Sequence, residues 1–179
     1  MRTGADEERA PKYAHIERER RWLVDRRARP AIDGLPSVLI EDRSLVGTRM
    51  RLRRMTDSST GAVSLKLTKK YEAEDPLARP IVTSYLTEDE FSLLATLPAL
   101  SLAKRRFKLT KDGQSFSVDQ FIGSLSGLEL VEIEWADDAG LRALRAPDWT
   151  VREVSNDPRY QGGAHPQFGI PEEHPWPAS

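Results

Sequence analysis

Charged side chains recur at every second position along several segments of this sequence, and this alternation constrains the fold most. In a β-strand, residues i and i+2 point to the same face of the sheet, so each set shares one face. The intervening positions are largely apolar, as at Val131 and Ile133. The charged sets are Glu17, Glu19 and Arg21; Arg49, Arg51 and Arg53; Lys66 and Lys70; Lys104, Arg106 and Lys108; and Glu132 and Glu134. The alternation therefore predicts strands with one charged face and one mainly apolar face.

Turn residues between these runs predict mostly antiparallel strands joined by short connections. Strands are predicted at 15–25, 38–45, 48–55, 63–71, 81–86, 104–109, 116–122 and 128–135, with 149–154 also extended. A helix is predicted between Thr87 and Pro98, because Thr87 and Glu90 can form a capping box before an apolar stripe. Shorter helices are predicted at 137–146 and from Asn156 to Gly163. The absence of a βαβ rhythm favours an α+β protein built on a meander or closed barrel.

Composition narrows the functional classes. The 179 residues include 27 Lys and Arg, 28 Asp and Glu, and no Cys. The net charge of -1 disfavours a generic nucleic-acid binder, and the missing cysteines exclude thiolate metal sites and disulfides. No run of apolar residues is long enough to span a bilayer, and residues 1–12 resemble no secretory signal. We therefore expect a cytoplasmic protein, with 1–12 as a disordered leader and 163–179 as a Pro-rich tail.

The charged faces have two interpretations. A solvated sheet face is the common explanation for charged alternation, and strand by strand it is favoured. However, like charges on neighbouring strands repel, which suggests compensation by a ligand. Oxygen ligands such as Glu17, Glu19, Glu132 and Glu134 suit a hard cation, and Arg and Lys side chains suit phosphate oxygens. No phosphate-cradling glycine loop or dinucleotide fingerprint occurs, so side chains would have to bind the phosphates.

Several motifs, in order along the chain, resemble those of the CYTH superfamily, the triphosphate tunnel metalloenzymes, and its bacterial inorganic triphosphatases in particular. The first motif, Glu17-x-Glu19-x-Arg21, is similar to the family's Glu-x-Glu-x-Lys. The later motifs are Arg51-x-Arg53, the lysine strand around Lys66 and Lys70, Lys104-x-Arg106, Asp119-x-Phe121 before Glu132-x-Glu134, and 153–160. The resemblance covers about residues 13–162, which we take as one CYTH domain.

The resemblance implies an eight-stranded antiparallel β-barrel with flanking helices and charged side chains inside an open tunnel. It implies hydrolysis of a triphosphate, inorganic or organic, with Mg²⁺ or Mn²⁺. Glu19 and Arg21 would be catalytic. The implied metal ligands are Glu17, Glu19, Asp119, Glu132 and Glu134. The implied triphosphate ligands are Arg51, Arg53, Lys66, Lys70, Lys104, Arg106 and Arg159, the last reaching the tunnel from the C-terminal helix.

Two departures from the family pattern qualify these roles. Arg21 replaces the usual lysine and cannot give up a proton at ordinary pH, so it cannot serve as a base. The segment 162–166 departs from the usual ending, so the tail is expected to cover the tunnel mouth instead. Two alternatives remain open: an adenylyl cyclase of the CYTH type, and a non-catalytic binder of polyphosphate or RNA 5′ ends. The sequence does not specify the oligomeric state, and a homodimer is compatible with it.

Overall fold

The computed structural model describes residues 10–161 and 169–171. Its strands are β1 (His15–Val24), β2 (Ser37–Leu45), β3 (Met50–Asp57), β4 (Val63–Lys70), β5 (Ala78–Tyr85), β6 (Ala99–Lys111), β7 (Gln114–Ile122), β8 (Glu129–Glu134) and β9 (Thr150–Glu153). The helices are α1 (Glu88–Leu94), α2 (Asp138–Ala143), and the 3-10 turns η1 (Gly123–Leu125) and η2 (Pro158–Tyr160). Among these described helices, none has the length and apolar character that crossing a membrane requires.

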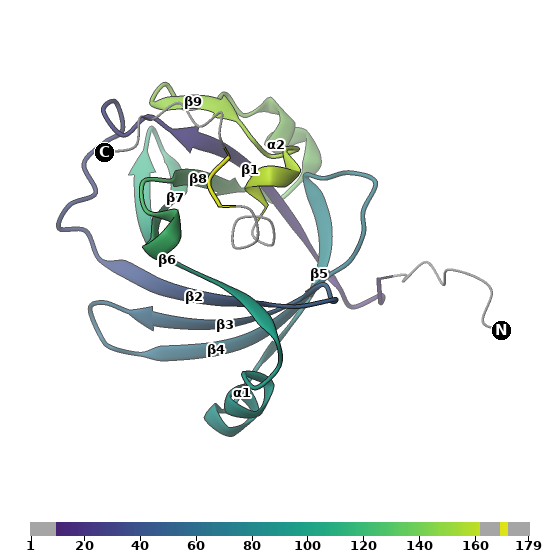
Figure 1. The fold of residues 1–179 in the computed structure, drawn as a ribbon. Helices are drawn as coiled ribbons and strands as arrows, with labels where there is room; N and C mark the ends of the chain where they lie inside the picture. The colour runs from purple at the N-terminus through teal and green to yellow at the C-terminus, as the bar shows by residue number, and fades with distance from the viewer. Residues whose placement is uncertain (1–9, 162–168, 172–179) are drawn as a thin grey trace.

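The strands form one antiparallel sheet that closes on itself. The order is β5-β4-β3-β2-β6-β7-β8-β1-β9, and an additional pairing of β5 with β1 closes β1 to β8 into a barrel. One edge of β1 pairs with β8. The other edge pairs with β5 near Glu17 and with β9 near Trp22. The predicted eight-stranded antiparallel barrel is therefore confirmed (Figure 1), and β9 is an addition outside the closed ring.

Local sequence explains the tightest connection of the barrel. Strands β6 and β7 are joined at Asp112 and Gly113, which have φ angles of 52° and 74°. Positive φ at both central residues is typical of a two-residue hairpin turn, and Asp-Gly favours it. This hairpin fixes the register in which Arg106 lies opposite Asp119.

The apolar core packs against the outside of the barrel. The buried cluster includes Trp22, Val118, Val131 and Ile133 from outward strand faces, together with Trp149. The rings of Phe116 and Trp149 pack edge to face, with their centroids 5.6 Å apart. Trp22 and Trp149 are thus packing residues of the outer core. Helix α2 lies over this side in Figure 1, and its Leu141 is buried.

A second apolar cluster lies partly inside the barrel, which the alternation did not predict. Leu23, Phe121 and Leu130 lie on the same strand faces as Arg21, Asp119 and Glu132, but nearer one end of the barrel. Tyr160 from η2 is fully buried with them, and Ile170 packs against the cluster. The inward face is therefore charged in the middle of the barrel and apolar at this end.

The helices differ in part from the predicted ones. Helix α1 begins after Thr87 with the predicted capping box, but it ends at Leu94, before Pro98. The predicted C-terminal helix is wrong as far as residue 161, because the structure has only the short 3-10 turn η2 there. The predicted end of that helix at Gly162 and Gly163 lies outside the described residues. So do residues 1–9 of the predicted leader and most of the predicted tail.

Candidate active site

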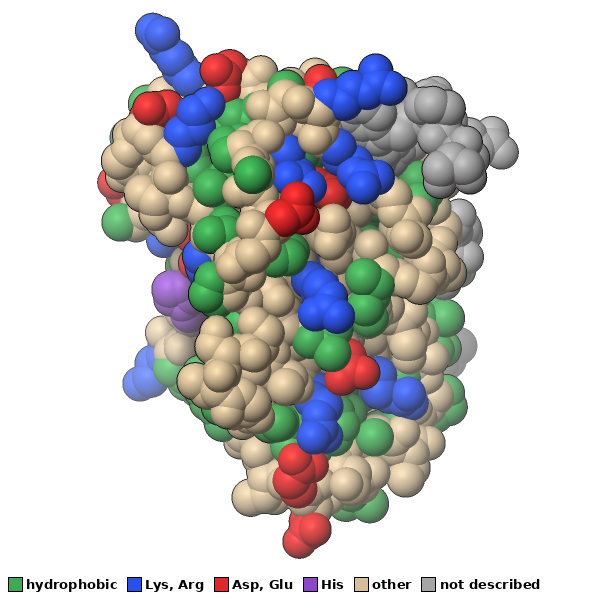
Figure 2. Space-filling model, turned by 90° about the vertical axis from the view of Figure 1, so that its left-hand side faces the viewer, with side chains coloured by type: hydrophobic (Ala, Val, Ile, Leu, Met, Phe, Trp, Pro, Cys, Tyr) green, Lys and Arg blue, Asp and Glu red, His purple; other side chains and the backbone are tan. Residues whose placement is uncertain are grey.

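The inside of the barrel holds a cavity of about 390 Å³. Most of the predicted site residues line it together: Glu17, Glu19, Arg21, Arg51, Arg53, Lys70, Lys104, Arg106, Glu132 and Glu134. They come from strands that are distant in sequence, and the closure of the barrel brings them to one space. On the outer face in Figure 2, by contrast, side chains of both charges are interspersed with apolar ones.

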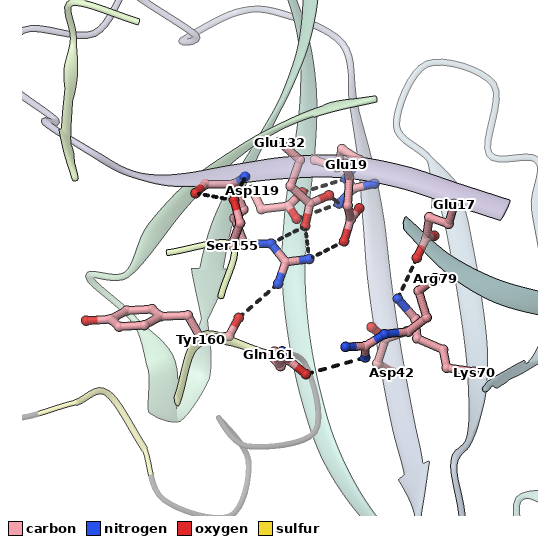
Figure 3. A network of polar contacts seen from close by, with 12 residues as sticks. Glu17, Glu19, Asp42, Lys70, Arg79, Asp119, Glu132, Ser155, Tyr160 and Gln161 are labelled. Atoms are coloured by element: carbon pink, nitrogen blue, oxygen red, sulfur yellow. Dashed lines mark hydrogen bonds and ion pairs between the residues drawn. The ribbon is translucent and has the colours of Figure 1, made fainter. Parts of the chain in front are cut away.

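Strands β1 and β8 form an acidic wall around one arginine. Their register sets Glu19 opposite Glu134 and Arg21 opposite Glu132. The guanidinium of Arg21 donates to Glu19 Oε1 at 2.9 Å through Nη2 and to Glu132 Oε1 at 2.9 Å through Nε. Its Nη1 donates to the carbonyl oxygen of Tyr160 at 2.9 Å. Arg21 therefore holds two carboxylates and the η2 turn in fixed positions. Figure 3 labels its partners Glu19, Glu132 and Tyr160.

The charges on this wall shift one another's pKa values. Burial disfavours the charge of Arg21, but Glu132 and Glu19 outweigh it and raise the pKa of the guanidinium. Burial acts against the charge of Glu132 too, yet Arg106 and Arg21 hold the pKa of Glu132 well below its usual range. The pKa of Glu19 is raised, because burial and the neighbouring Glu132 both oppose its charge. Arg21 thus stays charged and can position groups without exchanging a proton, as predicted.

Strand β3 contributes arginines that are organised by Asp42 of β2. Asp42 is 3% exposed and accepts two hydrogen bonds from Arg53, at 2.6 Å from Nε and 2.7 Å from Nη2. Arg51 Nε lies 3.7 Å from Asp42 Oδ1 and has no hydrogen-bond partner among the described residues. Burial opposes ionisation of Asp42, but Arg51 and Arg53 lower its pKa to about 2. Arg53 is a fixed cation, whereas Arg51 keeps donors available for a ligand.

Strand β6 supplies Lys104 and Arg106, which share the carboxylate of Asp119. Arg106 donates to both oxygens of Asp119 at 2.6 Å, and Lys104 Nζ donates to Oδ2. Asp119 is fully buried and lies outside the residues that line the cavity. The structure therefore does not place it among the carboxylates available to a metal. Its negative charge is already engaged by two cations, so it positions them instead.

One ion pair crosses the inside of the barrel between strands that are not neighbours. Lys70 of β4 donates to Glu17 Oε2 of β1 at 2.6 Å, and β5 lies between those strands (Figure 3). Burial acts against the charge of Glu17, but Lys70 lowers the pKa of its carboxyl below the usual value. A predicted metal ligand and a predicted phosphate ligand are thus paired with each other.

Two further predicted residues lie away from the cavity. Lys66 faces the ring of Tyr85 with its ammonium 5.0 Å from the ring centre, near the end of β5. Arg159 donates to Asp157 Oδ2 at 2.7 Å and lines a separate surface depression beside η2. The structure has a three-residue 3-10 turn instead of the predicted helix here and does not place Arg159 among the residues that line the cavity, so its role in binding stays a prediction.

Further polar side chains line the cavity but were not assigned to the site from the sequence, among them Asp42, Arg79 and Gln161. Asp42 and Arg79 lie on β2 and β5, whose sequences lack the charged alternation that identified the other site residues. A signal for Asp42 existed, since it alternates with Ser44 in a predicted strand. Gln161 follows η2 and accepts a hydrogen bond from Arg79 at 3.4 Å, a contact that sequence spacing does not reveal.

The carboxylates suit a small hard cation in their chemistry. Within residues 10–161 and 169–171, no group of three or more Asp, Glu, His or Cys forms a preassembled metal cluster. Glu19 and Glu134 are nevertheless directly opposite on adjacent strands and both line the cavity. Mg²⁺ is commonly held by one or two carboxylates together with water and substrate phosphates. A bound cation would also relieve the repulsion between Glu19 and Glu132, so the residues fit such an ion.

Two curated proteins that are similar to part of this chain are both inorganic triphosphatases. No protein-family model matches the chain. A curated inorganic triphosphatase of Acetivibrio thermocellus is 41% identical over 59 residues, which are 33% of this chain and 36% of that protein. The inorganic triphosphatase of Nitrosomonas europaea is 43% identical over 53 residues, 30% of this chain and 35% of that protein. The match thus spans about a third of the length of each curated relative.

Solved structures extend the similarity over most of the chain. The crystal structure of the hypothetical protein NE1496 is 27% identical, with a TM-score of 0.57, and covers 87% of this chain and 99% of that one. Another structure, described as the inorganic triphosphatase NE1496, is 26% identical with a TM-score of 0.54, and covers 83% of this chain and 92% of that one. These comparisons confirm the resemblance to the CYTH superfamily that the ordered motifs indicate.

Proposed function

We propose that the protein is a metal-dependent triphosphatase that hydrolyses a phosphoanhydride bond of a triphosphate bound inside the barrel. The observation that carries the proposal is the pairing of an acidic wall with a basic wall around one cavity. The acidic wall suits a divalent cation, and the basic wall suits a linear polyanion. The names of the relatives support the same reaction and favour inorganic tripolyphosphate as the substrate to test first.

The basic side chains would bind the phosphate chain. Arg51 and Arg53 come from β3, Lys104 and Arg106 come from β6 on the other side of β2, and all four line the cavity. Arginine can donate two parallel hydrogen bonds to a phosphate group, and lysine adds a compact charge. Asp42 and Asp119 hold these cations from behind, so their donors are already oriented when the ligand arrives. Such preorganisation lowers the cost of ordering long side chains.

The acidic wall would hold the metal, which we expect to be Mg²⁺ or Mn²⁺. Glu17, Glu19, Glu132 and Glu134 are the candidate ligands, since all four line the cavity. A bound divalent cation supplies charge stabilisation for a phosphate chain under attack. Arg21 bridges Glu19 and Glu132 and is suited to position a phosphate or the attacking water. Water would attack the terminal phosphorus, the bridging P–O bond would break, and orthophosphate and pyrophosphate would leave.

The test is a substrate panel with two readouts. Tripolyphosphate, ATP and thiamine triphosphate are each incubated with the protein and Mg²⁺ or Mn²⁺, and orthophosphate and cyclic AMP are measured. We expect orthophosphate release that stops when the metal is chelated. No release from any triphosphate would overturn the proposal. Cyclic AMP from ATP would indicate the cyclase alternative, and metal-independent binding without turnover would indicate the binding module.

The biological setting belongs to the same proposal. We expect the enzyme to act in the cytoplasm on a small-molecule triphosphate, with no membrane or nucleic-acid partner. The sequence leaves a homodimer open, and light scattering of the purified protein would test it.

A further inference from the structure

Arg79 lies in the cavity but has no role in the site predicted from the sequence. It is the second residue of β5, directly opposite Glu17 of β1 across the pairing that closes the barrel. Its side chain is partly buried and lines the cavity together with Glu17 and Lys70. Arg79 therefore presents a guanidinium at the seam where the first and fifth strands meet (Figure 3).

The partners of Arg79 differ from those of the other cations in the cavity. Arg21, Arg53 and Lys70 each contact a carboxylate. The same is true of Arg49, Arg51, Lys104 and Arg106. Among the described residues, Arg79 is the cavity-lining cation without a carboxylate partner. Its hydrogen bond goes from Nη1 to the neutral amide oxygen of Gln161 at 3.4 Å.

This difference determines how readily each cation can turn to a new ligand. For Lys70 to contact a phosphate fully, its 2.6 Å ion pair with Glu17 has to be weakened. Arg79 gives up only a long hydrogen bond to an uncharged group, which contributes less than a bond between charged partners. Its guanidinium is also not engaged in an ion pair within the described residues, so forming bonds to a polyanion breaks no existing ion pair.

We propose that Arg79 is a further triphosphate-binding residue, which exchanges its bond with Gln161 for bonds to a phosphate group of the substrate. The inference rests on the proposed function and extends its binding site to β5. Gln161 follows η2, and η2 is also held by the bond from Arg21 to the carbonyl oxygen of Tyr160. The exchange at Arg79 thus releases one of the contacts that tie the end of η2 to the cavity.

The test compares Arg79→Gln with the wild type by calorimetric titration of tripolyphosphate without metal and by steady-state kinetics with Mg²⁺. We expect binding to weaken by about 10- to 100-fold, the range for losing a hydrogen bond between charged groups. KM should rise by a similar factor, and kcat should change less. Arg79→Lys restores the charge without the fork and should recover part of the affinity.

Two control variants separate ligand binding from structural support. Arg18 is the residue after Glu17 on β1 and lies opposite Ala78. Its side chain points to the outer face, where Nε lies 2.5 Å from Asp138 Oδ1. Arg18→Gln makes the same charge change outside the cavity and should leave affinity unaltered. Gln161→Ala removes the amide contact but keeps the Arg79 charge, so its affinity should not fall below that of the wild type.

The possible outcomes are distinct. Equal affinity of Arg79→Gln and wild type would overturn the inference, and so would an equal loss in Gln161→Ala, because the contact itself would then matter. An equal loss in Arg18→Gln would also overturn it, because the effect would then follow net charge alone. If the wild type neither binds nor hydrolyses any triphosphate, the proposed function fails instead. Thermal unfolding of each variant verifies that the protein titrated is folded.

Discussion

The two faces of the same strands have opposite chemistry, and both are largely buried. On β1 and β8, Trp22 and Val131 pack in the outer core, while Arg21 and Glu132 line the cavity. An ordinary half-buried sheet directs its apolar face to the core and its polar face to water. Here the polar face is enclosed by the barrel, so its charges have to satisfy one another.

The difference between the two faces indicates that stability and function come from different sides of the same strands. Burying an apolar side chain is favourable, whereas burying a charge is costly unless it is paired. The ion pairs inside the barrel therefore offset their own desolvation and add little net stability. We infer that the outer face stabilises the barrel and that the inner face, stabilised by its counter-ions, is kept for the ligand. The following variants test this division, starting from the largest expected effect.

Trp149→Ala should have the largest effect on stability. Trp149 is 1% exposed and packs edge to face on Phe116 in the outer core. Removing a buried indole should lower the free energy of unfolding by about 3 to 5 kcal/mol. Urea denaturation measures this loss, and activity per folded molecule should be retained. Trp135→Ala is the matched control, because Trp135 is 38% exposed and should cost less. Equal losses would contradict the outer core as the main source of stability.

Glu19→Gln should have the opposite effect, with a loss of activity and no loss of stability. The change keeps the size of the side chain and an acceptor for Arg21 but removes the charge of a candidate metal ligand. We expect kcat to fall by about 100- to 1,000-fold, as when a group that stabilises the transition state is lost. Because burial and Glu132 raise the pKa of Glu19, its ionised form destabilises the fold, so the variant should be at least as stable. A marked drop in melting temperature would contradict the inference that the inner face serves the ligand and not the stability of the fold.

Asp42→Asn should change how the free energy of unfolding depends on pH, through the ion pairs of the inner face. The pKa of Asp42 in the fold is about 2, below its usual 3.8, because Arg51 and Arg53 outweigh burial. A depressed pKa means that the carboxylate stabilises the fold above its unfolded pKa, and that this stability is lost as pH falls toward the folded value. The contribution is about 2 kcal/mol at neutral pH.

Urea unfolding between pH 7 and pH 2 measures this contribution. The Asp42→Asn variant should be less stable at pH 7, and its stability should fall less than that of the wild type as the solution is acidified. Glu41→Gln changes the exposed neighbour on β2 and serves as the control. If both variants follow the wild-type pH curve, Asp42 is not the counter-ion that the geometry indicates.

Arg159→Ala should have the smallest effect. Arg159 is half exposed, pairs with Asp157 and lies outside the cavity. Exposed ion pairs contribute roughly 0 to 1 kcal/mol, so both stability and KM should stay close to wild type. Kinetics with tripolyphosphate measure this. A tenfold rise in KM would restore the role implied by the family resemblance and require η2 to rearrange.

Much of the fold and site could be predicted from local patterns. Period-two alternation identified the strands and the face of each side chain, because the direction of a side chain depends only on its position along the strand. The Thr87 capping box and the Asp112-Gly113 turn were equally local. The order of the motifs then indicated the barrel and most of its inward residues.

Depth along the barrel could not be predicted, because it depends on the stagger of strands that are distant in sequence. Lys66 and Lys70 share a face of β4, yet Lys70 reaches Glu17 while Lys66 lies against Tyr85. Asp119 and Glu132 both face inward, but Asp119 is covered by the cations it holds.

The sequence by itself thus determined which segments form strands and which of their side chains share a face, since both depend on local geometry. Only the tertiary structure decided which inward charges pair with each other and which remain for a ligand. Closure of β5 onto β1 sets Arg79 opposite Glu17 and beside Gln161, and the hairpin register sets Asp119 behind Arg106. Such pairings depend on distances of a few ångströms between segments far apart in the chain, which no local pattern specifies.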